Sequence, residues 1–287
     1  MRIALPTLVN AGLTTSGRRD ELVTLVTQVI AQSRADLVVL PELSVSGYPE
    51  LVDAERDDAI LDEVSEPVDG PAGRAFGVLA AETGCAIVYG ISERSPDSSE
   101  RFNSLVWAEP DGTLTGYRKM HLTSDERRHW TPGEHIGLAH SRDGVVGLSA
   151  CNDKAFAEIY EVHRAAGARL SVIASAWSSH PGSPEVAGDV WAEQSELFDR
   201  SRAAETAMVV ASTNYHGPKA PGSTANFCDG RRVVDPLGRL QPVTQEYEFG
   251  PVWDVDLAAA SAGVDHLHGS QFFGRQSTRT GRDTSTV

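Results

Sequence analysis

The chain has 287 residues, 40% of them hydrophobic and 23% charged, a composition typical of a globular protein rather than a disordered or fibrous one. A formal net charge of −15 repels phosphate backbones and anionic lipid, so neither nucleic acid nor membrane is an expected partner. No apolar run approaches the ~20 residues that cross a bilayer, and the N-terminus lacks the features of a secretory signal.

The cysteine and histidine patterns argue against a metal site. The three cysteines form no CxxC pair, and the nine histidines show no HExxH spacing, so no metal or cofactor is expected. The odd cysteine count also argues against a disulfide framework, which makes a reducing cytoplasm the expected location.

The length and the absence of an internal linker indicate one α/β domain over residues 1–270. Residues 271–287 are rich in Arg, Thr, Ser and Gly and show little periodicity. They are expected to form a tail that is mobile unless a partner subunit orders it.

In the first half of the chain, helical and strand patterns alternate. An apolar stripe over 21–35 predicts a helix, and a buried-strand pattern follows at 37–40. The next expected elements are a helix at 76–83, a strand at 85–91, and a hairpin of 105–107 with 114–117 around Asp111-Gly112.

The second half continues this alternation. Strands are expected at 145–150, 171–175 and 208–212, helices at 155–166 and 195–204, and a late hairpin before residues 236–238. Hairpins mixed with αβ crossovers predict two β layers covered by helices on both outer faces, which is a four-layer αββα sandwich.

Three strand-like segments end in residues that complement one another chemically: Glu42, Lys119 and Cys151. A thiol is only a few per cent ionised near neutral pH, so it needs a base during attack, and Glu42 can supply one. Attack on an amide or nitrile carbon builds negative charge, which Lys119 and the backbone N–H of Asn152 can stabilise. These residue types predict acyl transfer through a thioester.

The same segments resemble the three catalytic motifs of the nitrilase superfamily of carbon–nitrogen hydrolases. They are Pro41-Glu42-Leu43, the stretch from Tyr117 to Leu122, and Cys151-Asn152-Asp153, in the family's order. The resemblance extends from Met1 to about residue 238. It implies that Glu42 is the general base, Lys119 the oxyanion stabiliser and Cys151 the nucleophile, and it implies the αββα fold.

Many members of this superfamily keep a second glutamate that orients the lysine and the substrate. Glu126 is the candidate here, with Glu134 as the second choice. Tyr48, Trp130 and Trp177 are candidate walls of a substrate pocket, and Trp191 is a weaker one. Cys85 and Cys228 are expected to be core thiols, and His121 and His129 structural or surface residues.

The expected activity is hydrolysis of a small carboxamide to a carboxylate and ammonia without a cofactor. The alternatives are a nitrilase, an N-carbamoyl hydrolase, or an inactive binding protein on the same fold. The resemblance also implies a homodimer or a larger even-numbered oligomer. The helix at 155–166, with Ile159, Val162 and Ala166 on one stripe, is the candidate interface.

Overall fold

The computed structural model describes residues 1–13, 18–49, 54–180, 183, 186–219, 223 and 225–258. The expected tail at 271–287 and the expected domain boundary at 270 lie outside these residues. Within the described part of the chain, no helix is both long enough and apolar enough to cross a membrane.

The first of two sheets has seven strands in the order β11-β12-β1-β2-β3-β4-β5. Its central strands β1, β2 and β3 are parallel and the others antiparallel, so the sheet is mixed. Its strands are β1 (Arg2–Ala4), β2 (Leu37–Val39), β3 (Ala86–Arg94), β4 (Arg101–Ala108), β5 (Leu114–Arg118), β11 (Gln245–Tyr247) and β12 (Gly250–Asp254).

The second sheet has five strands in the order β10-β9-β8-β7-β6 and is also mixed, with β7, β8 and β9 parallel. Its strands are β6 (Gly137–Ser141), β7 (Gly144–Ala150), β8 (Leu170–Ala174), β9 (Val209–Thr213) and β10 (Arg232–Val234).

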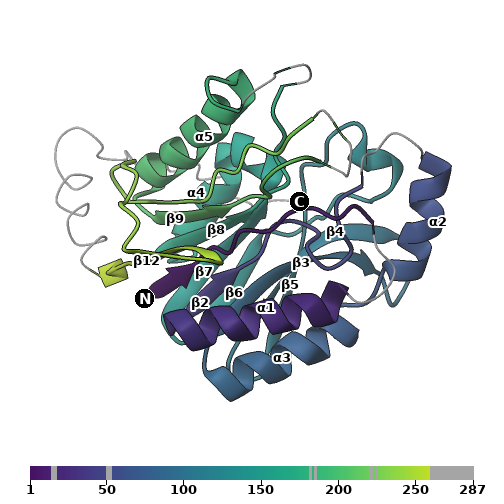
Figure 1. Cartoon of the computed structure of the whole chain (residues 1–287), viewed down its shortest axis with the longest axis horizontal. Helices are drawn as coiled ribbons and strands as arrows, with labels where there is room; N and C mark the ends of the chain where they lie inside the picture. The colour runs from purple at the N-terminus through teal and green to yellow at the C-terminus, as the bar shows by residue number, and fades with distance from the viewer. Residues whose placement is uncertain are drawn as a thin grey trace, which may run out of the picture.

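The helices lie on the two outer faces of the paired sheets (Figure 1). One pair, α1 and α3, packs together beside the seven-stranded sheet, and α4 and α5 lie at the opposite side of the molecule. The helices are α1 (Arg18–Ser33), α2 (Ala54–Val64), α3 (Pro71–Thr83), α4 (Ala157–Ala165) and α5 (Val190–Thr206), with short 3₁₀ turns η1 (Glu126–Arg128) and η2 (Cys151–Ala155).

Three apolar cores separate four layers. One joins α1 and α3 to the seven-stranded sheet through residues such as Val26, Phe76 and Ile87. Another lies between the two sheets, and the third joins α4 and α5 to the five-stranded sheet. Burial of apolar area in all three spaces confirms the predicted four-layer sandwich.

The expected hairpin is confirmed, because β4 and β5 pair antiparallel around Gly112, which has φ +90°. A late hairpin is also present before residues 236–238: Pro218 and Asn226 pair antiparallel, and the N–H groups of Phe227 and Lys219 donate to the carbonyls of Gly217 and Ala225, both at 2.8 Å. The short strand β10 follows and pairs with β9. The sequence reading missed β1, β6, β11, β12 and α2. The three-residue strands are too short to show alternation, and α2 is strongly acidic.

Candidate active site

Each of the three candidate catalytic residues comes shortly after a strand. Glu42 lies three residues beyond β2, Lys119 follows β5 directly, and Cys151 follows β7 and begins η2. Glu42 and Lys119 therefore come from the seven-stranded sheet and Cys151 from the five-stranded sheet. The site is assembled where the ends of both sheets meet.

The backbone at two of these positions is unusual for L-residues. Cys151 has φ +47° and Leu43, next to Glu42, has φ +51°, both in the left-handed region. Such conformations cost about 1–3 kcal/mol each and persist where surrounding contacts impose them. The turn at Leu43 lies directly against β3. A Cβ on Gly90 of β3 would lie 2.1 Å from the Leu43 nitrogen, so only glycine lets this turn rest on the strand.

Lys119 lies between two buried carboxylates. Its Nζ donates to Glu42 Oε1 at 2.7 Å and to both oxygens of Glu126, at 2.7 and 2.9 Å. All three side chains are fully buried. One ammonium and two carboxylates without access to water make a strongly coupled group, and its protonation governs the site.

Different donors surround the two carboxylates. Besides Lys119, Glu42 accepts hydrogen bonds from the Asn103 amide at 2.7 Å and from the Ala176 backbone N–H at 2.9 Å. Glu126 accepts from the Tyr48 hydroxyl at 2.9 Å and from the Thr123 backbone N–H at 2.8 Å.

The pKa values of the two glutamates are displaced in opposite directions. Burial raises the pKa of Glu42, and the opposing effect of Lys119 does not cancel it, because the charge of Glu126 raises it further. For Glu126, burial also favours the neutral acid, but Lys119 and the hydrogen-bond donors outweigh it and lower the pKa. These directions favour the anionic form of Glu126 and make Glu42 the carboxylate of the two that more readily takes up a proton.

The pKa values of Lys119 and Cys151 are also shifted by burial and by neighbouring charges. Burial alone would lower the pKa of Lys119, but Glu126 and Glu42 outweigh it and raise the pKa well above its usual range, so the residue stays cationic. Burial raises the pKa of the Cys151 thiol, and Glu42 adds to this while Lys119 opposes it. The raised pKa favours the neutral thiol, a form that requires a base if it is to act as a nucleophile.

Asp153 connects the nucleophile turn to the segment that carries Lys119. Its buried carboxylate accepts from the Ala150 N–H at 2.9 Å, from the Tyr117 hydroxyl at 2.6 Å and from the His121 N–H at 3.0 Å. The Asn152 side chain adds a hydrogen bond to the His121 carbonyl at 3.1 Å. These bonds span the two sheets and fix Cys151 relative to Lys119.

A cavity of about 400 Å³ opens at Cys151. Tyr48, Trp177 and Trp191, three of the candidate pocket residues, line this cavity. Trp130 does not line it: that residue is 3% exposed, packs in the core, and donates its indole N–H to Ser92. The remaining lining residues are Thr123, Asp125, Asn152, Ala176, Ser178, Gln194 and Lys219.

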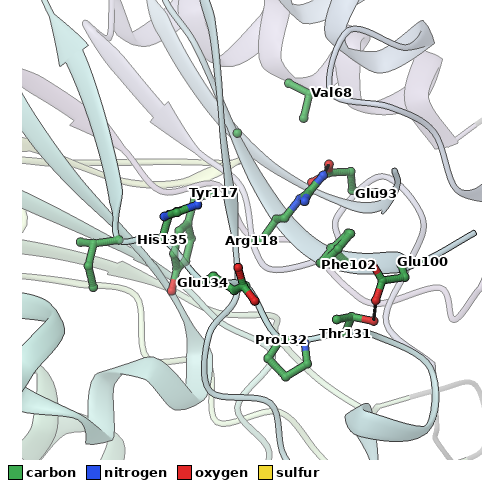
Figure 2. A pocket seen from close by; sticks show the side chains of 13 residues that line it. Val68, Glu93, Glu100, Phe102, Tyr117, Arg118, Thr131, Pro132, Glu134 and His135 are labelled. Atoms are coloured by element: carbon green, nitrogen blue, oxygen red, sulfur yellow. Dashed lines mark hydrogen bonds and ion pairs between the residues drawn. The ribbon is translucent and has the colours of Figure 1, made fainter. Parts of the chain in front are cut away.

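A larger hollow of about 520 Å³ lies at the edge strand β5 and does not include the thiol (Figure 2). Glu134 and His135 line this hollow, where Arg118 points to Glu93 and is bound to it at 2.6 Å. The second candidate for the supporting glutamate, Glu134, lines this hollow, whereas Glu126 contacts the Lys119 ammonium.

The other titratable side chains that the sequence singled out are paired or buried within the fold. The rings of His121 and His129 bind Asp153 and Asp58 at 3.0 and 2.9 Å. Cys85 and Cys228 are buried free thiols. In the described part of the chain, no group of three or more His, Cys, Asp or Glu side chains is arranged to hold a metal ion.

Sequence reasoning missed Asn103, Asp153, Gln194 and Lys219 as parts of the site. Asn103 gave one signal, since it is a polar residue in a predominantly buried strand, where an amide requires a partner. Gln194 and Lys219 come from α5 and from a loop, and only the tertiary structure brings them to the cavity.

Known proteins resemble this chain over most of its length. The family description "Carbon-nitrogen hydrolase" matches residues 11–262. A probable nitrilase of Schizosaccharomyces pombe is 28% identical over 77% of this chain and 76% of its own length. An (R)-stereoselective amidase of a Pseudomonas species is 27% identical over 81% of this chain and 78% of its own. A solved structure from Xanthomonas campestris, a CN-hydrolase superfamily protein with an arsenic adduct in its active site, is 26% identical, covers 94% of this chain and 95% of its own, and gives a TM-score of 0.76.

Proposed function

The chain belongs to the carbon–nitrogen hydrolase family, as its three motifs indicated, and we propose that it hydrolyses a small carboxamide to a carboxylate and ammonia. The observation that carries this proposal is the hydrogen-bonded group of Glu42, Lys119 and Glu126 at the same site as the thiol of Cys151. It provides a nucleophile, a base and a fixed cation.

In the acylation step, Glu42 takes the thiol proton as Sγ of Cys151 attacks the amide carbon. The carbonyl oxygen becomes an oxyanion, stabilised by Lys119 Nζ and by the N–H of Asn152 at the start of η2, where the turn itself offers no acceptor. Glu42 then passes its proton to the amide nitrogen, the C–N bond breaks, and ammonia leaves a thioester on Cys151.

In the deacylation step, Glu42 takes a proton from water, whose oxygen attacks the thioester carbon. The second oxyanion forms at the same two donors, the C–S bond breaks, and the proton returns to sulfur. Glu126 keeps Lys119 charged and oriented throughout, because its own pKa is lowered.

The direct test is ammonia release from a panel of small carboxamides, with matching nitriles and N-carbamoyl compounds assayed beside them. The proposal expects turnover of carboxamides in the wild type and its loss in Cys151→Ala. Turnover of nitriles or carbamoyl compounds instead would replace the carboxamide assignment with one of the alternatives. Failure of every substrate, with no acylation of Cys151, would favour an inactive binding protein.

We also propose that the protein is a homodimer or a larger even-numbered oligomer. The expected stripe on α4 needs correction, because Ile159 is fully buried in its own subunit. Exposed apolar side chains of the layer formed by α4 and α5 include Val162 on α4 and Val190 and Leu197 on α5, which are 43%, 60% and 61% exposed. Light scattering would reject the proposal if it gave only the 30.8 kDa chain mass. A reducing cytoplasm, proposed as the location, suits a reaction that needs a free thiol.

A further inference from the structure

Lys154 is a buried cation three residues beyond the nucleophile that has no part in the reaction steps above. It is 1% exposed, and its Nζ lies 2.9 Å from Asp199 Oδ1 and 3.0 Å from the Ser195 hydroxyl, both on α5. Burying a charge is costly even when it is paired, so this lysine calls for an explanation beyond packing.

The Lys154 ammonium lies over the ring of Trp177, 5.4 Å from the ring centroid. Trp177 lines the cavity at Cys151, whereas Lys154 does not, so the indole stands between the cation and the substrate space. The indole N–H donates to the Trp191 carbonyl at 2.9 Å, and the Phe198 ring contacts it edge-on, which keeps the wall in place.

A third charge belongs to this cluster. Arg232 on β10 binds the other oxygen of Asp199 at 2.7 Å. Lys154, Asp199 and Arg232 together carry one net positive charge, in a chain whose formal net charge is −15. The cation nearest the Trp177 ring is therefore part of a cluster whose charge is opposite in sign to that of the whole protein.

We propose that Lys154 is a specificity-determining residue that acts through Trp177 and selects uncharged or anionic acyl groups over cationic ones. An aromatic face attracts cations through its quadrupole, and Lys154 already uses this attraction from behind. A cationic substrate group in the cavity would face a Trp177 ring that already binds Lys154. It would also be repelled by the Lys154 charge, which is buried and which water therefore screens poorly.

The kinetic test rests on the proposed amidase function. It compares kcat/KM for a neutral aliphatic amide and for a matched amide with a terminal ammonium group. In Lys154→Met, the preference for the neutral amide should fall about fivefold, as expected from removing one poorly screened charge near the substrate. Lys154→Arg should keep the wild-type preference.

Arg232→Met is the matched control. Both methionine variants leave the cluster with a net charge of zero, but Arg232→Met retains the cation over Trp177. Its preference should stay within about twofold of the wild type. Equal changes in the two methionine variants, or no change in Lys154→Met, would overturn the proposal.

A second measurement is independent of any amide turnover. Cys151 is treated with a neutral and with a cationic methanethiosulfonate, and the rate of disulfide formation at that residue is followed by peptide mass spectrometry. The cationic-to-neutral rate ratio should rise about fivefold in Lys154→Met and not in Arg232→Met or Lys154→Arg. If Lys154→Met does not fold, Lys154→Gln replaces it.

The two measurements separate the two proposals. If the cationic-to-neutral rate ratios change as expected but no amide is hydrolysed, the amidase function is rejected and the role of Lys154 is supported. Amide turnover with unchanged ratios in Lys154→Met would support the function and reject that role.

Discussion

Asp153, two residues after the nucleophile, accepts a hydrogen bond at 2.6 Å from the hydroxyl of Tyr117, two residues before Lys119. Tyr117 belongs to the seven-stranded sheet, and Asp153 follows a strand of the five-stranded one. The pair therefore fixes the distance between the thiol and the cation that the proposed mechanism brings to one carbonyl group.

Tyr117→Phe should lower kcat about tenfold with a smaller change in KM, because a misplaced nucleophile costs more in the transition state than in binding. Asp153→Asn should cost more, since its NH₂ group would face donors, and should reduce the free energy of unfolding by about 1–3 kcal/mol. Steady-state kinetics and urea unfolding measure both effects. A wild-type kcat in Asp153→Asn would show that the hydrogen bonds of Asp153 are not needed for catalysis.

Glu42→Gln and Lys119→Met should each reduce kcat/KM at least ~100-fold, the former by removing proton transfer and the latter by removing oxyanion stabilisation. Lys119→Met should also destabilise the fold by about 3–5 kcal/mol, because two buried carboxylates lose their cation. Arg118→Met is the control: Arg118 precedes Lys119 but binds Glu93. Near-native kinetics in Lys119→Met would remove Lys119 from the mechanism.

The acid side of the pH profile should report Glu42. The base acts only when ionised, so kcat/KM should fall as the pH drops through a pKa above the ~4.3 of a free glutamate. Asn103→Ala removes a donor to the carboxylate and should move this limb to higher pH. Ser104→Ala, next on β4 and bound to Glu93, should leave it unchanged. A limb that stays in place in Asn103→Ala would contradict the assignment.

The left-handed backbone at Cys151, with φ +47°, predicts an effect on stability. Glycine adopts this conformation without the steric cost that any Cβ imposes. Cys151→Gly should therefore unfold with a free energy about 1 kcal/mol higher than Cys151→Ala, although glycine is normally the less stable choice. Urea denaturation of the two inactive variants gives the comparison, and a less stable glycine variant would show that the turn carries no strain.

The layered fold was predictable because strands such as β2 and β8 are largely apolar runs and α1 shows one apolar stripe. Helix starts were less predictable. The beginning of α3 is marked by Pro71 at its first turn, and that of α5 by Asp189, whose side chain caps two N–H groups. These are single-residue signals that precede the apolar pattern, so the periodicity placed both starts too late.

Glu42, Lys119 and Cys151 could be proposed from the sequence because Glu42 and Cys151 follow apolar runs and Lys119 lies beside apolar residues, in three motifs in the family's order. The supporting residues could not, because their roles depend on contacts between sheets. Trp130 and Trp177 look alike in sequence, yet one packs in the core and the other lines the cavity. Likewise, Ile159 and Val162 share the expected stripe of α4, but the curvature of the core buries only the first.

The central claim, a thioester on Cys151, is tested most directly by intact-mass spectrometry of the enzyme quenched during turnover of a carboxamide. The expected result is an adduct of the substrate mass less ammonia, located on the Cys151 peptide and absent from Cys151→Ala, which should also release no ammonia. An adduct on Cys85 or Cys228 instead, or continued ammonia release by Cys151→Ala, would contradict the mechanism.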